Sequence, residues 1–256
     1  MNVSKIFVTG GSHCIGGGFN WDEVINIYKT EMNVNINNRF DITYPKLVGD
    51  YLNSDVIYEG EFGGSINRMI RKTYEYIFNN DSTNTLFILE VPPGWRDEFY
   101  SNELNRSVNM TIGNILSADD NTDTACGNDV EDLHKIHKGI INYFYNFIDY
   151  EIDKRKWMYS LVGLFSYFKL HKLKYIVMDN GDFQQFLKST NKSEDDYNLL
   201  WFNKGNALNN WINENGLTIK VETNNKSNDE HLSIKGHQMV AEKIINYVKE
   251  NKSLFS

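Results

Sequence analysis

A serine near the start of the chain and a histidine near its end have the side chains needed for nucleophilic catalysis. Ser12 follows Gly10 and Gly11, where a glycine turn exposes a hydroxyl and aims the serine N–H at a developing oxyanion. A serine hydroxyl becomes a good nucleophile when an imidazole takes its proton, and a carboxylate usually orients that imidazole. His231, with Asp229 two residues before it, offers both groups. Alone, Ser12 is explained as a turn residue and His231 as an exposed or capping residue; together with Asp229 they predict a catalytic site.

Apolar patterns predict the elements that must position these residues. Continuous β-branched and aromatic runs indicate strands, and apolar positions at helical spacing indicate helices. The predicted strands cover 4–9, 55–59, 85–91, 174–179 and 218–222, and the predicted helices cover 41–53, 65–79, 131–153, 155–171 and 235–250. Because strands alternate with helices, we predict an α/β fold with a mostly parallel sheet and helices on both faces.

The predicted sheet brings distant segments together. In an open parallel sheet, the binding crevice lies beyond the carboxyl ends of the strands. Ser12, residues 63–64, residues 92–94 and the loop 223–231 each follow a predicted strand, so all four can meet at that edge. The 256 residues suit one domain, with the stretch around 95–155 as an irregular insertion.

Composition narrows the range of partners. The chain has 26 Lys and Arg against 34 Asp and Glu, a formal net charge of −8. That charge argues against a nucleic acid or a membrane as a partner. Two cysteines, Cys14 and Cys126, give no disulfide framework and fit a reducing compartment. No secretory signal or membrane-spanning run is visible, so we expect a cytoplasmic protein, in host cytoplasm or a virion if the source is viral.

The sequence gives little support for a metal-binding site. Residues 119–130 have part of the spacing of an EF-hand but lack its turn glycine and its bidentate glutamate. His134 and His137 lie three residues apart on a predicted helix, without an HExxH motif or a third distant ligand. We therefore predict no metal site, a solvated loop over 119–130 and a solvated helix end at the two histidines.

Several short motifs resemble, in chain order, those of the SGNH/GDSL hydrolases. Residues 10–12 (GGS) resemble the first conserved block of that family, residues 63–68 (GGSINR) the second, and residues 229–241 the last. Residues 44–47 (YPKL) and 96–100 (RDEFY) are similar to stretches found in a phage-like subgroup. The resemblance therefore covers most of the chain outside 101–155.

This resemblance implies a fold and a reaction. The implied fold is a three-layer α/β/α sandwich of the flavodoxin-like kind, and the implied reaction is hydrolysis of an acyl or acetyl ester of a small molecule or a glycan by the predicted serine, histidine and aspartate. The backbone N–H groups of Ser12 and of Gly63 or Gly64 would form the oxyanion hole, with Asn67 as a candidate side-chain donor. No metal or organic cofactor is implied.

The chain departs from the family pattern at three places. The first block reads Gly-Gly-Ser in place of Gly-Asp-Ser, and Asn228 occupies the usual aspartate position, so Asp229 must act from a different spacing. The third block lacks its oxyanion asparagine, because residues 90–94 read EVPPG. Loss of such a donor costs about 100- to 1000-fold in turnover. Either Asn67 or Arg96 replaces it, or the chain is a weak or inactive member of the fold with a binding or structural role.

A second alternative is an NAD(P)-dependent short-chain dehydrogenase. Residues 9–16 (TGGSHCIG) resemble the glycine-rich turn of those enzymes, and Tyr150 and Lys154 have their Tyr-x-x-x-Lys spacing. Cys14 stands where a glycine lets the backbone approach a pyrophosphate. About one Tyr-x-x-x-Lys is expected by chance in a chain this rich in tyrosine and lysine, and this alternative leaves 229–241 unexplained.

Overall fold

A parallel sheet forms the centre of the molecule. The computed structural model describes residues 2–16, 39–61, 64–92, 96–102, 105–111, 149–179, 181–193, 196–200, 202, 208–219 and 229–255. Its main sheet has four strands, all parallel, in the order β2-β1-β3-β6. Their bounds are β1 (Lys5–Thr9), β2 (Asp55–Tyr58), β3 (Thr85–Glu90) and β6 (Lys174–Met178). A parallel bridge between Val177 and Leu199 extends the sheet beyond β6.

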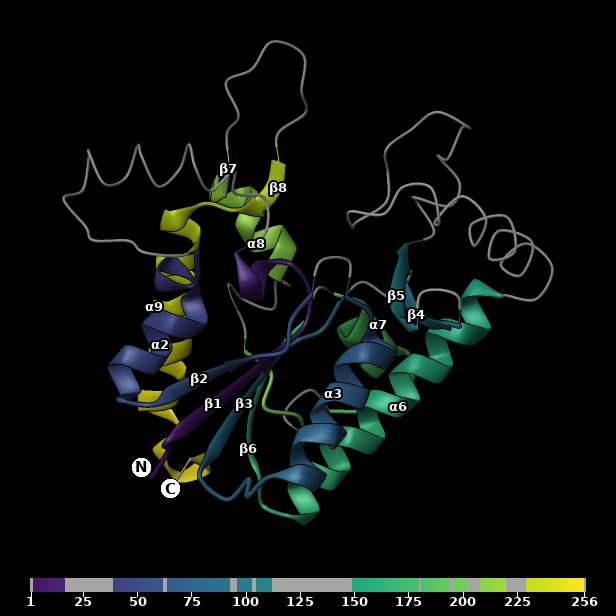
Figure 1. Ribbon diagram of the computed structural model, residues 1–256, viewed down its shortest axis with the longest axis horizontal. Coiled ribbons are helices and arrows are strands. Elements are labelled where there is room, and N and C mark those ends of the chain that lie inside the picture. Colours follow the sequence, from purple (N-terminus) through teal and green to yellow (C-terminus); the bar gives the residue numbers. More distant parts are fainter. Residues whose placement is uncertain are drawn as a thin grey trace, which may run out of the picture.

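Helices cover both faces of this sheet (Figure 1). One face is covered by α3 (Ile66–Asn79), α6 (Tyr150–Leu170) and α7 (Asp182–Ser189). The other face is covered by α2 (Tyr44–Leu52), α8 (Leu208–Glu214) and α9 (Ile234–Glu250). The predicted three-layer α/β fold with a mostly parallel sheet is therefore confirmed.

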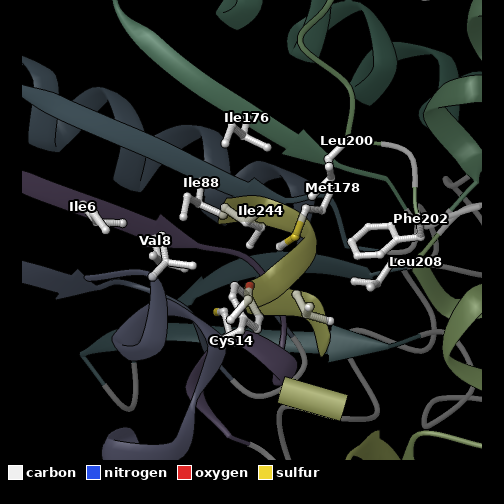
Figure 2. Close-up of a cluster of buried hydrophobic side chains, with 14 of the residues drawn as sticks. Ile6, Val8, Cys14, Ile88, Ile176, Met178, Leu200, Phe202, Leu208 and Ile244 are labelled. Carbon is white, nitrogen blue, oxygen red and sulfur yellow. The ribbon is translucent and has the colours of Figure 1, made fainter. Parts of the chain in front are cut away.

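The two faces of the sheet hold two separate apolar cores. Because side chains alternate along a strand, Ile6 and Val8 of β1 join the core beneath α2 and α9, shown in Figure 2. Phe7, between them, joins the opposite core beneath α3 and α6. Burial on both faces explains why β1, β3 and β6 read as continuous apolar runs instead of alternating ones.

The strand order distinguishes this fold from that of dinucleotide-binding enzymes. The first strand lies between the second and third, as in flavodoxin-like sheets, whereas the dinucleotide-binding order places the third strand outside the second. Lys154, the lysine of the dehydrogenase-like spacing, pairs instead with Asp182 of α7, with 2.6 Å between Nζ and Oδ1. The topology therefore contradicts the dehydrogenase alternative.

The segment before β6 is one long helix instead of the predicted break near 154. The helix α6 begins after Asp149, whose side chain accepts a hydrogen bond from the N–H of Ile152 at 3.1 Å. Such a cap satisfies a helix N–H group that has no partner within the helix. The predicted boundary near residue 154 was wrong, because no helix-breaking residue interrupts the helix there. Residues 131–148, which include both histidines of the predicted helix end, lie outside the described residues.

Two antiparallel pairs differ from the sequence expectations. Part of the predicted irregular stretch forms a hairpin of β4 (Arg96–Ser101) and β5 (Arg106–Thr111). The predicted fifth strand does not join the main sheet: β7 (Thr218–Ile219) pairs antiparallel with β8 (Asp229–Leu232), and residues 220–222 lie outside the described part. Figure 1 shows β7 and β8 apart from the main sheet. Among the described helices, none has the length and apolar character needed to cross a membrane.

Candidate active site

The turn after β1 presents Ser12 at the carboxyl edge of the sheet. Gly10 has a φ of +152°, and a Cβ at that position would lie 2.4 Å from the carbonyl oxygen of Glu90, so only glycine fits. Ser12 then begins a short 3-10 helix, η1 (His13–Ile15). The Ser12 residue is 9 % exposed. The glycine turn that the sequence predicts is therefore present, and Glu90 of β3 packs directly against Gly10.

The segment after β2 packs directly against this turn. The N–H of Glu61 donates to the carbonyl of Gly10 at 3.3 Å, and the Thr9 hydroxyl donates to the carbonyl of Glu59 at 3.3 Å. A Cβ on Gly64 would lie 2.5 Å from the Gly10 oxygen. The first two motifs of the sequence are thus neighbours because β1 and β2 are adjacent parallel strands.

A short strand brings His231 to the serine. His231 lies on β8, a strand and not the predicted loop, and the following Ser233 donates its N–H to the carbonyl of Leu217 at 2.7 Å. Ser233 also caps α9, because its hydroxyl accepts the N–H of Gly236 at 3.1 Å. These contacts fix the approach of β8, and the Nε2 atom of His231 lies 2.7 Å from Oγ of Ser12.

The other predicted site residues have different surroundings. The side-chain amide of Asn67 donates to Oδ1 of Asp97 at 2.7 Å, and the N–H of Gly64 donates to the carbonyl of Glu61 at 3.0 Å. Gly63 lies outside the described residues. The backbone of Asp229 pairs with Ile219, and its side chain lies outside the described part. Their roles in catalysis therefore stay predictions.

Glu90 is a site residue that the sequence reasoning did not single out. It ends β3, is 2 % exposed and accepts a hydrogen bond on Oε2 from the Tyr44 hydroxyl at 3.0 Å. Its Oε1 lies 3.6 Å from Nδ1 of His13, the residue after Ser12. Burial raises the pKa of Glu90 from 4.5 to about 7, against the opposing effect of its hydrogen bonds and of Arg96. A glutamate ending an apolar strand, LFILE, was the available signal.

Histidines and a cysteine complete the surroundings of the turn. The rings of His13 and His231 meet edge to face, with 5.8 Å between their centroids. His237 is fully buried and accepts the N–H of Tyr44 on Nδ1 at 3.2 Å; burial lowers its pKa to about 3, so it stays neutral. The Cys14 thiol donates to the carbonyl of Gly11 at 3.1 Å, and burial raises its pKa. Among the described residues, an imidazole nitrogen lies within hydrogen-bond distance of the Ser12 hydroxyl, whereas the Cys14 thiol donates to a backbone carbonyl.

The arrangement suits proton abstraction from a serine. A hydroxyl within hydrogen-bond distance of an imidazole nitrogen has the geometry of a nucleophile and its general base.

Among the described residues, no three His, Cys, Asp or Glu side chains gather into a group that could hold a metal ion.

Comparison with known proteins finds similarity at the level of structure alone. No protein-family model matches the sequence, and none of the curated proteins does. The structure is similar to that of a member of the lipolytic protein G-D-S-L family from Veillonella parvula (11% identity, TM-score 0.47, covering 95% of this chain and 97% of that chain). It is also similar to an acetylxylan esterase from Geobacillus stearothermophilus (10% identity, TM-score 0.44, 97% and 96% coverage). A third similar structure is an acetyl xylan esterase from Butyrivibrio proteoclasticus (12% identity, TM-score 0.46, 100% and 66% coverage).

Proposed function

We propose that this protein hydrolyses carboxylic esters, with Ser12 as the nucleophile and His231 as its general base. The observation that carries the proposal is the 2.7 Å separation between Oγ of Ser12 and Nε2 of His231, two atoms from opposite ends of the chain. The hydroxyl follows the carboxyl end of a central strand, where ligands bind in open parallel sheets. A turn serine with only a structural role would not require a histidine at this distance.

The proposed reaction has two halves. Oγ of Ser12 attacks the ester carbonyl carbon while His231 takes the hydroxyl proton, and His231 then gives that proton to the departing alkoxide, which leaves as an alcohol. Water next attacks the acyl-serine, His231 again takes a proton and returns it to Oγ, and a carboxylic acid departs. Asp229 is the proposed partner that orients His231.

The oxyanion of the tetrahedral intermediate needs donors near Ser12. The predicted backbone donors are Ser12 itself with Gly63 or Gly64. Of these, the N–H of Gly64 already donates to the carbonyl of Glu61 at 3.0 Å, which leaves Ser12 and Gly63 as the proposed pair. Of the two candidate side chains, Asn67 donates to Asp97, whereas Nη1 of Arg96 lies 3.6 Å from the position of a Cβ on Gly11, beside the nucleophile turn. We therefore propose that the guanidinium of Arg96 donates to the oxyanion, in place of the asparagine amide of the SGNH/GDSL pattern.

The experiment measures the hydrolysis of p-nitrophenyl acetate and p-nitrophenyl butyrate by the wild type, Ser12→Ala and His231→Ala. A fluorophosphonate probe, from which a reactive serine displaces fluoride, reports the nucleophile independently of the substrate. The matched control is Ser82→Ala, which removes another buried serine near the amino end of β3. We expect turnover and labelling in the wild type and the control, and neither in the other two variants.

Either of two results would count against the proposal. Turnover that survives in a folded Ser12→Ala variant would show a different nucleophile. A wild type that neither hydrolyses these esters nor reacts with the probe would favour the binding or structural role that the missing asparagine suggests. If the wild type is active, acetylated oligosaccharides test whether a glycan ester, the substrate class implied by the motif resemblance, is preferred to the p-nitrophenyl esters.

A further inference from the structure

The carboxylate of Glu90 lies at the centre of the groups that surround Ser12. Hydrogen bonding from the backbone of Gly11, the residue before the serine, reaches this carboxylate. His13, the residue after the serine, approaches Oε1 at 3.6 Å. The Tyr44 hydroxyl, from the start of α2, holds Oε2 at 3.0 Å. Glu90 thus contacts the nucleophile turn on both sides of Ser12 and is itself fixed from a third element.

We propose that Glu90 is a positioning residue of this site, whose buried carboxylate holds the Ser12 turn in place through its contacts with Gly11, His13 and Tyr44. This inference rests on the proposed ester hydrolysis, and it assigns to β3 a role that the sequence motifs do not contain. Glu90 acts through the turn, without touching the substrate.

The charges around Glu90 fit this role. The positive charge of Arg96 on β4 stabilises the ionised carboxylate. The neighbouring Tyr44 and Cys14 stay neutral, because burial and the Glu90 charge raise the pKa of each.

A carboxylate with only a structural role would not need to contact the turn on both sides of Ser12. Burial of a charge is costly unless polar partners compensate, and here burial raises the pKa of Glu90 to about 7. The partners that compensate come from η1, α2, β4 and β8 and from the Gly11 backbone. An apolar residue would fill the end of a buried strand without that cost, so the charged residue at this position points to a role in the site.

The test compares Glu90→Gln with a matched control, Asp179→Asn. Asp179 is also a buried carboxylate at the carboxyl edge of the sheet, just after β6, but it accepts backbone N–H groups of α7 at 3.2 and 2.9 Å. We measure kcat and KM separately for p-nitrophenyl acetate, and the rate of labelling of Ser12 by the fluorophosphonate probe.

For Glu90→Gln we expect kcat and the labelling rate to fall by about 10- to 100-fold with little change in KM, a part of what general-base catalysis contributes. Glu90→Asp, which retains the carboxylate, should recover part of the rate. Asp179→Asn should leave kcat and the labelling rate unchanged while it is folded.

The possible failures are distinguishable. An active wild type with unchanged kcat and an unchanged labelling rate in folded Glu90→Gln would overturn this inference and leave the proposed function standing. If Glu90→Gln does not fold, a Glu90→Asp variant that changes KM but keeps the kcat and the labelling rate of the wild type would overturn it. A wild type without turnover or labelling would overturn the proposed function, and this inference with it.

Discussion

The carboxyl ends of β3 and β6 lie side by side in the sheet, and each carries a buried carboxylate. Glu90 is the last residue of β3, and Asp179 directly follows β6. Asp179 accepts the N–H groups of Phe183 and Gln184 and so caps the start of α7. Glu90 accepts the Tyr44 hydroxyl and lies beside His13. Burial raises the pKa of both, to about 6 for Asp179 and about 7 for Glu90.

The difference between the two lies in where their partners come from. The hydrogen-bond donors of Asp179 belong to the chain that follows it, so one local cap satisfies the carboxylate. Glu90 is partnered by side chains of separate elements that converge only in the folded molecule. A buried carboxylate at the same sheet edge thus caps a helix in one case and, as we propose, holds a nucleophile turn in the other.

The largest expected effect comes from Gly10→Ala, which changes the contact between the turn and Glu90. The φ of +152° and a Cβ 2.4 Å from the Glu90 oxygen make alanine unsuitable there. We expect a loss of about 3 kcal/mol in the free energy of unfolding and loss of the proposed esterase activity. The matched control is Gly163→Ala in α6, where a Cβ meets nothing within 4 Å; it should stabilise by about 0.5 to 1 kcal/mol. Chemical denaturation measures both, and equal stabilities for the two variants would contradict this prediction.

Next in size is a pH-dependent difference in stability between Glu90→Gln and the wild type. Burial raises the pKa of Glu90 from 4.5 to about 7, so between these values the folded wild type binds more protons than the unfolded chain. Its stability must therefore fall as pH rises from 4.5 to 7, by about 3 kcal/mol at most, relative to a variant without this group.

Thermal unfolding at pH 5 and pH 8 measures this difference. The melting temperature of Glu90→Gln minus that of the wild type should increase with pH, whatever its sign at pH 5. The neutral, buried His237 is present in both proteins, so its own pH dependence cancels in the comparison. A difference in melting temperature that is the same at pH 5 and pH 8 would show that folding does not raise the pKa of Glu90.

Asp179→Ala should give a smaller, purely structural effect. It removes the acceptor for two backbone N–H groups of α7, and loss of such a cap costs about 1 to 2 kcal/mol. We expect a lower denaturation midpoint and normal kcat at 20 °C, a temperature at which the variant remains folded. A reduced kcat with unchanged KM in the folded variant would remove the contrast with Glu90.

The smallest effect is expected from Tyr44→Phe, which removes a single hydrogen bond to Glu90. The expected cost is about 1 kcal/mol, measured as a shift in the denaturation midpoint. The rate of the proposed ester hydrolysis should fall only a few-fold, because Gly11 and His13 continue to hold the carboxylate. A loss as large as that of Glu90→Gln would mean that Tyr44, not Glu90, dominates the positioning of the turn.

The sequence alone determined the main sheet and the strand that precedes Ser12. The four predicted strands at 4–9, 55–59, 85–91 and 174–179 agree with the structure within about one residue, because short continuous apolar runs leave few alternatives. The pair β4 and β5 was missed because charged and polar residues interrupt the apolar pattern of both strands.

Only the tertiary structure decided how the site comes together. The sequence predicted that Ser12 and His231 act together, but the 2.7 Å separation depends on β8 pairing with β7 and on Ser233 binding the carbonyl of Leu217. Glu90 shows the same limit more clearly, because its partners Gly11 and Tyr44 lie far from it in the sequence. Local patterns determine which segments become strands and helices, whereas contacts between distant residues exist only once the core has packed.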